Sequence, residues 1–131
     1  MRKYLSRAEG TVIIVINNFQ DLRVWQKAHG LVILVYGFTK RFPADEKFGL
    51  SSQMRRAGVS IASNITEGFK RKSNRMSLNF YNIADGSIEE LKYQLLLSRD
   101  LGYITDSEYK NSISLSEEVS KMLHGWVKHI R

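Results

Sequence analysis

The sequence predicts an all-α fold, an antiparallel up-down-up-down four-helix bundle. Four segments of about 20–28 residues repeat apolar side chains at the 3.6-residue period of helices that bury one face. Short connections join consecutive segments, which favours antiparallel neighbours. With 131 residues, 43% hydrophobic content and one proline, the chain is large enough for one packed domain and has little room for long disordered regions.

We divide the chain into an N-terminal extension, residues 1–18, and the four-helix bundle, residues 19–131. The β-branched run at residues 11–16 would suit a short strand. Because no second strand is evident from the sequence, this strand would need a partner molecule or would remain unpaired. A wrongly assigned start codon would explain the extension equally well.

The first helix is predicted over residues 19–41, and Pro43 ends it. Its expected apolar side consists of Leu22, Trp25, Val32, Val35, Tyr36 and Phe42. The second helix is predicted over residues 47–72, with Asp45 and Glu46 placing negative charge at its start, where the helix dipole favours it.

Two stripes run along the second helix when its residues are stepped at 100°. The apolar stripe comprises Leu50, Met54, Ala57, Gly58, Ile61, Ile65, Gly68 and Phe69. The polar stripe comprises Gln53, Arg56, Ser60, Asn64, Glu67 and Arg71. Short hydrogen-bonding side chains with charges at intervals suit contact with another protein surface or with phosphates better than contact with bulk water.

The third helix is predicted over residues 74–101, and Gly102 suits its C-terminal end. Its apolar face is expected to contain Phe80, Ala84, Ser87, Ile88, Leu91 and Leu95. The fourth helix opens at Thr105, which forms a capping-box pattern with Glu108. Its buried stripe is expected to contain Tyr109, Ile113, Ser116, Val119, Leu123, Trp126 and Ile130.

The net charge of +7 is confined to the first half of the chain. Residues 1–72 contain 13 Lys and Arg against 5 Asp and Glu, whereas residues 73–131 contain 7 against 8. Such an asymmetric basic charge indicates a polyanionic partner, most commonly RNA or DNA. Solubility is the alternative explanation.

The sequence contains no pattern typical of a catalytic, metal or cofactor site. His124 and His129 are five residues apart, which is not the spacing of a helical metal pair. Adjacent glutamates replace the Glu-x-x-His arrangement of di-iron bundles, and Ser60 and Ser63 have no evident base. We therefore expect a non-enzymatic protein without a metal or cofactor. No apolar run is long enough to span a membrane, and the absence of cysteine fits a cytoplasmic protein.

The candidate nucleic-acid contacts are basic residues of the second helix and of the segment just beyond its end: Arg55, Arg56, Lys70, Arg71, Lys72 and Arg75. One or two of the last four could simply complement the helix C-terminus, but four exceed that need. Lys40 and Arg41 are expected at the opposite end of the second helix, which gives two separate basic edges. Gln53, Ser60, Asn64 and Glu67 are the candidate polar contacts between or within subunits.

Several motifs resemble a bacterial four-helix bundle family that is encoded by intervening sequences in 23S ribosomal RNA genes. They are Phe19-x-Asp21-Leu22-x-Val24-Trp25-Gln26-Lys27-Ala28, Phe42-Pro43, Phe48-Gly49-Leu50, Gln53-x-Arg55-Arg56-Ala57, Ser60-Ile61-x-Ser63-Asn64-Ile65-x-Glu67-Gly68, Gly86-Ser87-x-x-Glu90-Leu91 and Leu101-Gly102-Tyr103-Ile104. The resemblance covers residues 19–127 and leaves the extension outside.

This resemblance implies a bundle that assembles into a homopentameric ring. The chain also looks like the basic pentameric accessory protein of diversity-generating retroelements, which binds a reverse transcriptase and nucleic acid. The leading interpretation is a ring-forming RNA- or DNA-binding protein, with RNA the favoured ligand and no membrane partner. The alternative is a protein-interaction scaffold or a reverse-transcriptase accessory subunit without its own nucleic-acid function.

Overall fold

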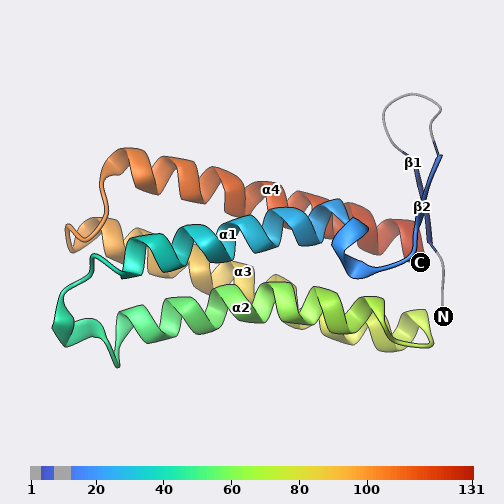
Figure 1. Ribbon diagram of the computed structural model, residues 1–131, viewed down its shortest axis with the longest axis horizontal. Coiled ribbons are helices and arrows are strands. Elements are labelled where there is room, and N and C mark those ends of the chain that lie inside the picture. The colour runs from blue at the N-terminus through green and yellow to red at the C-terminus, as the bar shows by residue number, and fades with distance from the viewer. Residues whose placement is uncertain (1–3, 8–12) are drawn as a thin grey trace.

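The predicted antiparallel four-helix bundle is confirmed by a computed structural model, which describes residues 4–7 and 13–131 (Figure 1). The four long helices are α1 (Arg23–Thr39), α2 (Leu50–Phe69), α3 (Asn74–Asp100) and α4 (Asp106–Ile130). Two short 3₁₀ helices, η1 (Phe19–Asp21) and η2 (Ala44–Glu46), precede α1 and α2. No helix in the described part of the chain is both long and apolar enough to cross a membrane.

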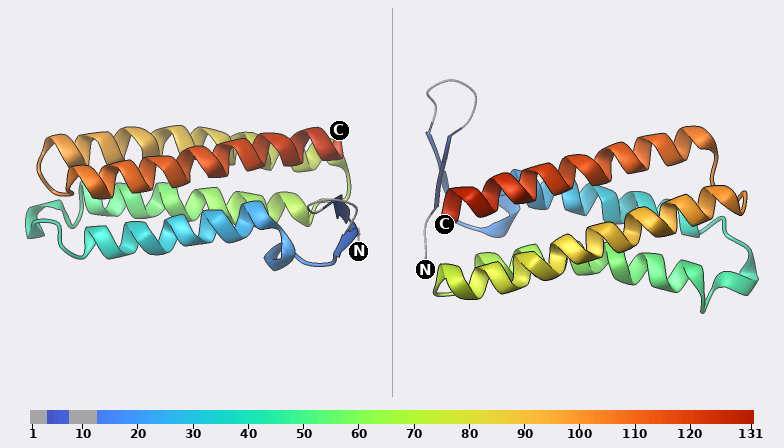
Figure 2. Two further views of the ribbon diagram at one scale, coloured as in Figure 1. Left: turned by 90° about the horizontal axis from the view of Figure 1, so that it is seen from above. Right: turned by 180° about the vertical axis from the view of Figure 1, so that it is seen from behind.

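Each helix packs against its neighbours in sequence, and α4 closes the bundle by packing against α1 (Figure 2). This arrangement follows from short connections, which allow consecutive helices to reverse direction but not to cross the bundle. Fully buried side chains from all four helices meet along the axis; they include Leu31, Met54, Ile61, Leu91 and Leu123.

The apolar stripe of α2 is confirmed, since all eight of its residues are buried. The glycines of this stripe pack against other helices of the same protomer. The Cα of Val32 in α1 would lie 3.9 Å from a Cβ at Gly58, and a Cβ at Gly68 would lie only 2.4 Å from Cε1 of Tyr81 in α3. Glycine at position 68 therefore lets the buried Tyr81 ring reach the backbone of α2.

The predicted apolar side of α1 is partly wrong. Val35 is buried as expected, but Tyr36 is exposed, and Ala28, Leu31 and Phe38 occupy the core instead. The run of apolar residues at 31–36 covers every side of the helix, so periodicity alone cannot select the face that the other helices will cover.

The extension forms a β-hairpin, and this corrects the expectation that its strand has no partner in the chain. Strand β1 (Tyr4–Arg7) pairs antiparallel with β2 (Ile13–Ile16), with Tyr4 opposite Ile16 and Arg7 opposite Ile13. The hairpin projects from the end of the bundle that carries the C-terminus (Figure 1). The sequence of β1 lacks the β-branched run that marks β2, so pattern reasoning overlooked it.

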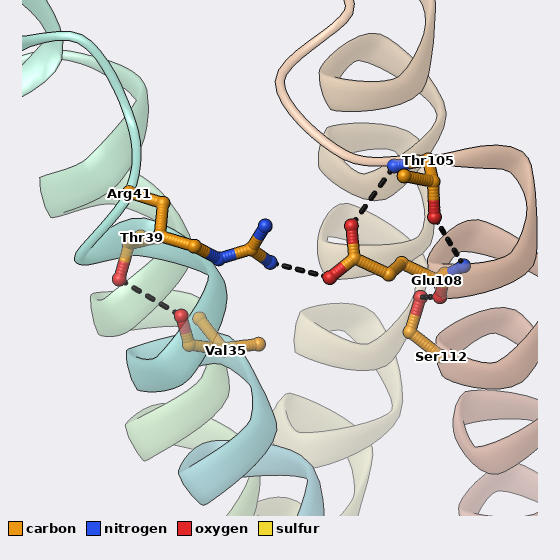
Figure 3. Close-up of polar contacts among 6 residues, drawn as sticks. All are labelled: Val35, Thr39, Arg41, Thr105, Glu108 and Ser112. Atoms are coloured by element: carbon orange, nitrogen blue, oxygen red, sulfur yellow. Dashed lines mark hydrogen bonds and ion pairs between the residues drawn. The ribbon is translucent and has the colours of Figure 1, made fainter.

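Local capping signals mark the end of α3 and the start of α4. The Thr105 hydroxyl accepts a hydrogen bond from the Glu108 amide at 3.0 Å, and the Glu108 carboxylate accepts one from the Thr105 amide at 2.9 Å, so the predicted capping box is present. Gly102 has a φ of 77°, as a helix-ending glycine requires. Arg41, after α1, forms an ion pair with Glu108, which ties the α1–α2 connection to the start of α4 (Figure 3).

Candidate nucleic-acid interface

The predicted basic residues fall into two groups at opposite ends of α2. Arg55 and Arg56 lie near its start, whereas Lys70, Arg71 and Lys72 follow its end. At 1.5 Å per residue, the two groups are separated by about 22 Å along the helix. The structure therefore retains two separate basic edges within one protomer.

The first group, which we call the α1–α2 cluster, consists of Lys40, Lys47, Arg55 and Arg56. All four line one groove between the end of α1 and the start of α2. Sequence reasoning identified the two arginines and noted Lys40, but it did not identify Lys47. The signal was present as five cations between residues 40 and 56, in a stretch with only two acidic residues.

The second group, the α2–α3 cluster, consists of Lys70, Arg71 and Lys72 in the turn between these helices and Arg75 in the first turn of α3. Lys70, Lys72 and Arg75 are exposed. Arg71 is half-buried: its Nε donates to the carbonyl of Glu67 at 3.0 Å, and its guanidinium lies 5.2 Å from the centre of the Phe80 ring. Arg71 therefore also stabilises the end of α2.

Lys70, Arg71 and Lys72 can stabilise the C-terminus of α2 through their positive charge. Arg75 cannot do so. It lies in the first turn of α3, because Ser73 is the N-cap and accepts a hydrogen bond from the Met76 amide at 3.2 Å. A positive charge at a helix N-terminus opposes the helix dipole. Local stability therefore does not explain this residue.

The segment that follows the hairpin lies beside the α2–α3 cluster. Asn17, Asn18 and Phe19 line a cavity of about 280 Å³ together with Lys70 and Arg71. The end of the extension thus contributes two polar side chains, and η1 contributes an aromatic ring, to the basic end of the bundle, which sequence reasoning did not foresee.

The polar stripe lies partly against α3. The Ser60 hydroxyl is 2.9 Å from the Ser87 hydroxyl, and the Asn64 side-chain amide donates to the Ser60 carbonyl at 2.8 Å. These two candidates make contacts within the protomer. Gln53, which begins the stripe, and Glu67, which precedes its last residue, are exposed.

Most cations of the two clusters form no ion pair with a described carboxylate. The ion pairs of the described residues use Lys27, Arg41, Lys92, Arg99 and His124. Arg71 aside, no member of either cluster pairs with a carboxylate of the described chain. An exposed cation without an acidic partner can bind an external anion without first breaking an ion pair.

The histidines and carboxylates of residues 4–7 and 13–131 do not gather into a candidate metal site. Within the described residues, no three His, Asp or Glu side chains lie close enough together to hold a metal ion. His124 contacts Asp85 at 3.0 Å, and both side chains are exposed to solvent. The hydrogen bond from the Thr105 amide and the adjacent Arg41 guanidinium lower the pKa of Glu108, which serves a structural contact.

Comparison with known proteins supports the architecture. A solved structure from Bacteroides thetaiotaomicron, described as a protein of unknown function from the S23 ribosomal protein family, superposes with a TM-score of 0.74. It is 29% identical and covers 80% of this chain and 98% of its own. No curated protein matches the chain. The family described as 23S rRNA-intervening sequence protein matches residues 20–125, and the chain therefore belongs to this family.

Proposed function

We propose that this protein is a non-enzymatic, RNA-associated nucleic-acid-binding protein that acts as a homo-oligomer. The observation that carries the proposal is the pair of basic clusters at the two ends of α2, whose exposed cations have no carboxylate partners in the described chain. Arg75 strengthens it, because its position opposes the dipole of α3. The family description, which refers to 23S rRNA intervening sequences, favours RNA.

Assembly would multiply the basic surface. Two clusters in each protomer would recur around a ring, and linked sites raise overall affinity without stronger contacts at any one of them. Exposed large apolar side chains on α3, namely Met76, Ile83 and Tyr93, offer surface that another copy could cover. We propose a homopentamer of 15.1 kDa protomers. Light scattering at micromolar concentration should report a mass several times that of the protomer, and a stable monomer would contradict this part of the proposal.

The binding test uses the exposed lysines of the α2–α3 cluster. Lys70→Gln combined with Lys72→Gln removes two charges without disturbing Arg71, which is engaged at the end of α2. The matched control is Lys110→Gln combined with Lys121→Gln, which removes two exposed charges from α4. The assay is an anisotropy titration with RNA at several salt concentrations. The cluster variant should bind every RNA sequence more weakly than wild type does, because phosphate contacts carry no base information.

The salt dependence gives the second readout. The plot of log affinity against log salt should lose about 0.7–0.9 of its slope for each phosphate contact removed. The control variant should keep the wild-type slope. If the wild-type protein binds no RNA or DNA near physiological salt, the nucleic-acid proposal is wrong, and salt-insensitive binding to a partner protein would support the scaffold alternative.

A further inference from the structure

The groove that holds the α1–α2 cluster combines cations with aromatic rings. It lies at the connection between α1 and α2, at the end of the bundle away from the hairpin (Figure 1). Its volume of about 830 Å³ is within the range of pockets that enclose a small organic ligand. No carboxylate of the described residues lines it. The side chains on which the argument depends are Tyr36, Lys40, Lys47, Phe48, Arg55 and Arg56.

Of the two acidic side chains in the preceding turn, Asp45 and Glu46, neither lines the groove, and Glu46 is held by hydrogen bonds at the start of α2. Glu46 accepts a hydrogen bond from the Leu50 amide through Oε1 at 3.2 Å. Its other oxygen, Oε2, accepts one from the Tyr103 hydroxyl at 3.0 Å. These bonds hold the carboxylate at the start of α2, and it is not among the groups that line the groove. The described residues that line the groove thus include four cations and no carboxylate, so the lining carries a net positive charge.

Arg55 is held in place before any ligand arrives. Its Nε donates to the Thr39 hydroxyl at 2.8 Å, and that hydroxyl in turn donates to the Val35 carbonyl at 2.8 Å. The guanidinium stacks over the Tyr36 ring, 4.5 Å from its centre. Its two terminal nitrogens have no partner among the described residues. A positioned guanidinium with free donors suits a phosphate, because little side-chain freedom remains to be lost on binding.

Phe48 adds an exposed aromatic ring, on which the base of a nucleotide can stack. A simple anion has no group that could use this ring. Phe48 is 89% exposed, the highest value among the large apolar side chains in the described chain. Its ring lies 5.5 Å from Nζ of Lys47. A base can stack on such a ring while its phosphates lie on neighbouring cations, which is how single-stranded nucleic acids bind without sequence preference.

We propose that this groove binds single-stranded nucleic acid, with phosphates on the α1–α2 cluster and an unpaired base stacked on Phe48. The inference rests on the proposed function and specifies its ligand. A duplex keeps its bases stacked inside the helix, so it could use the cations but not the ring. Single-stranded loops and ends present the unstacked bases that aromatic side chains bind.

The test compares two substitutions that affect different parts of the ligand. Phe48→Ala should weaken binding of a fluorescein-labelled oligouridylate of about 12 nucleotides by about 5- to 150-fold, the effect of losing one base stack. The salt slope should not change, because no charge is removed. Lys40→Gln combined with Lys47→Gln should instead lower the slope by about 1.4, for two single-strand contacts.

Matched controls separate this groove from the rest of the surface. Like Phe48, Ile33 is an exposed apolar side chain, but it lies on α1 outside the groove. Ile33→Ala should therefore leave binding of the oligouridylate unchanged. Lys110→Gln combined with Lys121→Gln should keep the wild-type slope. A duplex RNA of the same length should bind wild type and Phe48→Ala equally. Circular dichroism and light scattering should show the same fold and mass for every variant.

Several results would overturn the inference. If wild type binds RNA but Phe48→Ala behaves like Ile33→Ala, the groove does not stack a base, while the proposed function stands. A change of mass in Phe48→Ala would place the ring at a contact between copies. If polyglutamate displaces the oligouridylate and loses affinity in Phe48→Ala, the groove binds an acidic peptide. Failure of wild type to bind any nucleic acid would remove the proposed function itself.

Discussion

Gly68→Ala should destabilise the protein, although alanine is the better helix former. In an exposed helix interior this exchange stabilises by about 1 kcal/mol. At position 68 the new methyl group would lie 2.4 Å from Cε1 and 2.8 Å from Cδ1 of Tyr81. These are stiff ring atoms of a fully buried side chain, so either the ring or α2 must move.

The cost of such overpacking is typically about 1–3 kcal/mol. Position 68 is the next-to-last residue of α2, where the propensity gain is smallest, so the net effect should be a loss within that range. The clash also lies at the turn that carries the α2–α3 cluster, since the Ser77 hydroxyl of α3 donates to the Gly68 carbonyl at 2.6 Å.

Gly86→Ala is the control because it makes the same exchange in open space. A Cβ at Gly86 would meet no atom within 4 Å, and the residue lies in the interior of α3. This variant should gain about 1 kcal/mol from helix propensity alone. Urea denaturation at one fixed protomer concentration should therefore shift the two midpoints in opposite directions. If both variants are stabilised alike, the contact between Gly68 and Tyr81 is not as close as described.

Three further predictions follow from named contacts. Ile61→Ala should cost about 2–5 kcal/mol of unfolding free energy, because the side chain is fully buried between the helices; a loss below about 1 kcal/mol would contradict that burial. Arg75→Glu should raise thermal stability by about 0.3–1 kcal/mol by matching the dipole of α3 while weakening RNA binding; reduced stability would contradict the position of Arg75 in the first turn. Glu108 has a lowered pKa in the folded protein, so its contribution is complete above its unfolded pKa, near 4.5, and is lost as the pH falls through the lower folded value. Melting temperatures measured across that window should fall more steeply for wild type than for Glu108→Gln, and parallel curves would refute the linkage.

The sequence by itself determined the class of fold, the ends of α3 and the start of α4, because these depend on local signals, whereas the predicted ends of α1 and α2 differ from the observed ones by two to four residues. The period of α2 identified eight of its nine buried residues and missed only the polar Ser51. Gly102 and the pair of Thr105 and Glu108 marked helix ends through contacts made within a few residues. Such signals arise within one segment and do not depend on which other elements pack against it.

Only the tertiary structure decided which side of α1 is buried and which cations lie together. Tyr36 lines a groove because α2 places Arg55 over its ring. Lys47 lies in the same groove as Arg55 and Arg56 because of the path that the α1–α2 connection takes. The pairing of β1 with β2 likewise depended on a strand with no apolar pattern of its own. These outcomes depend on distances between elements, which periodicity and composition do not encode.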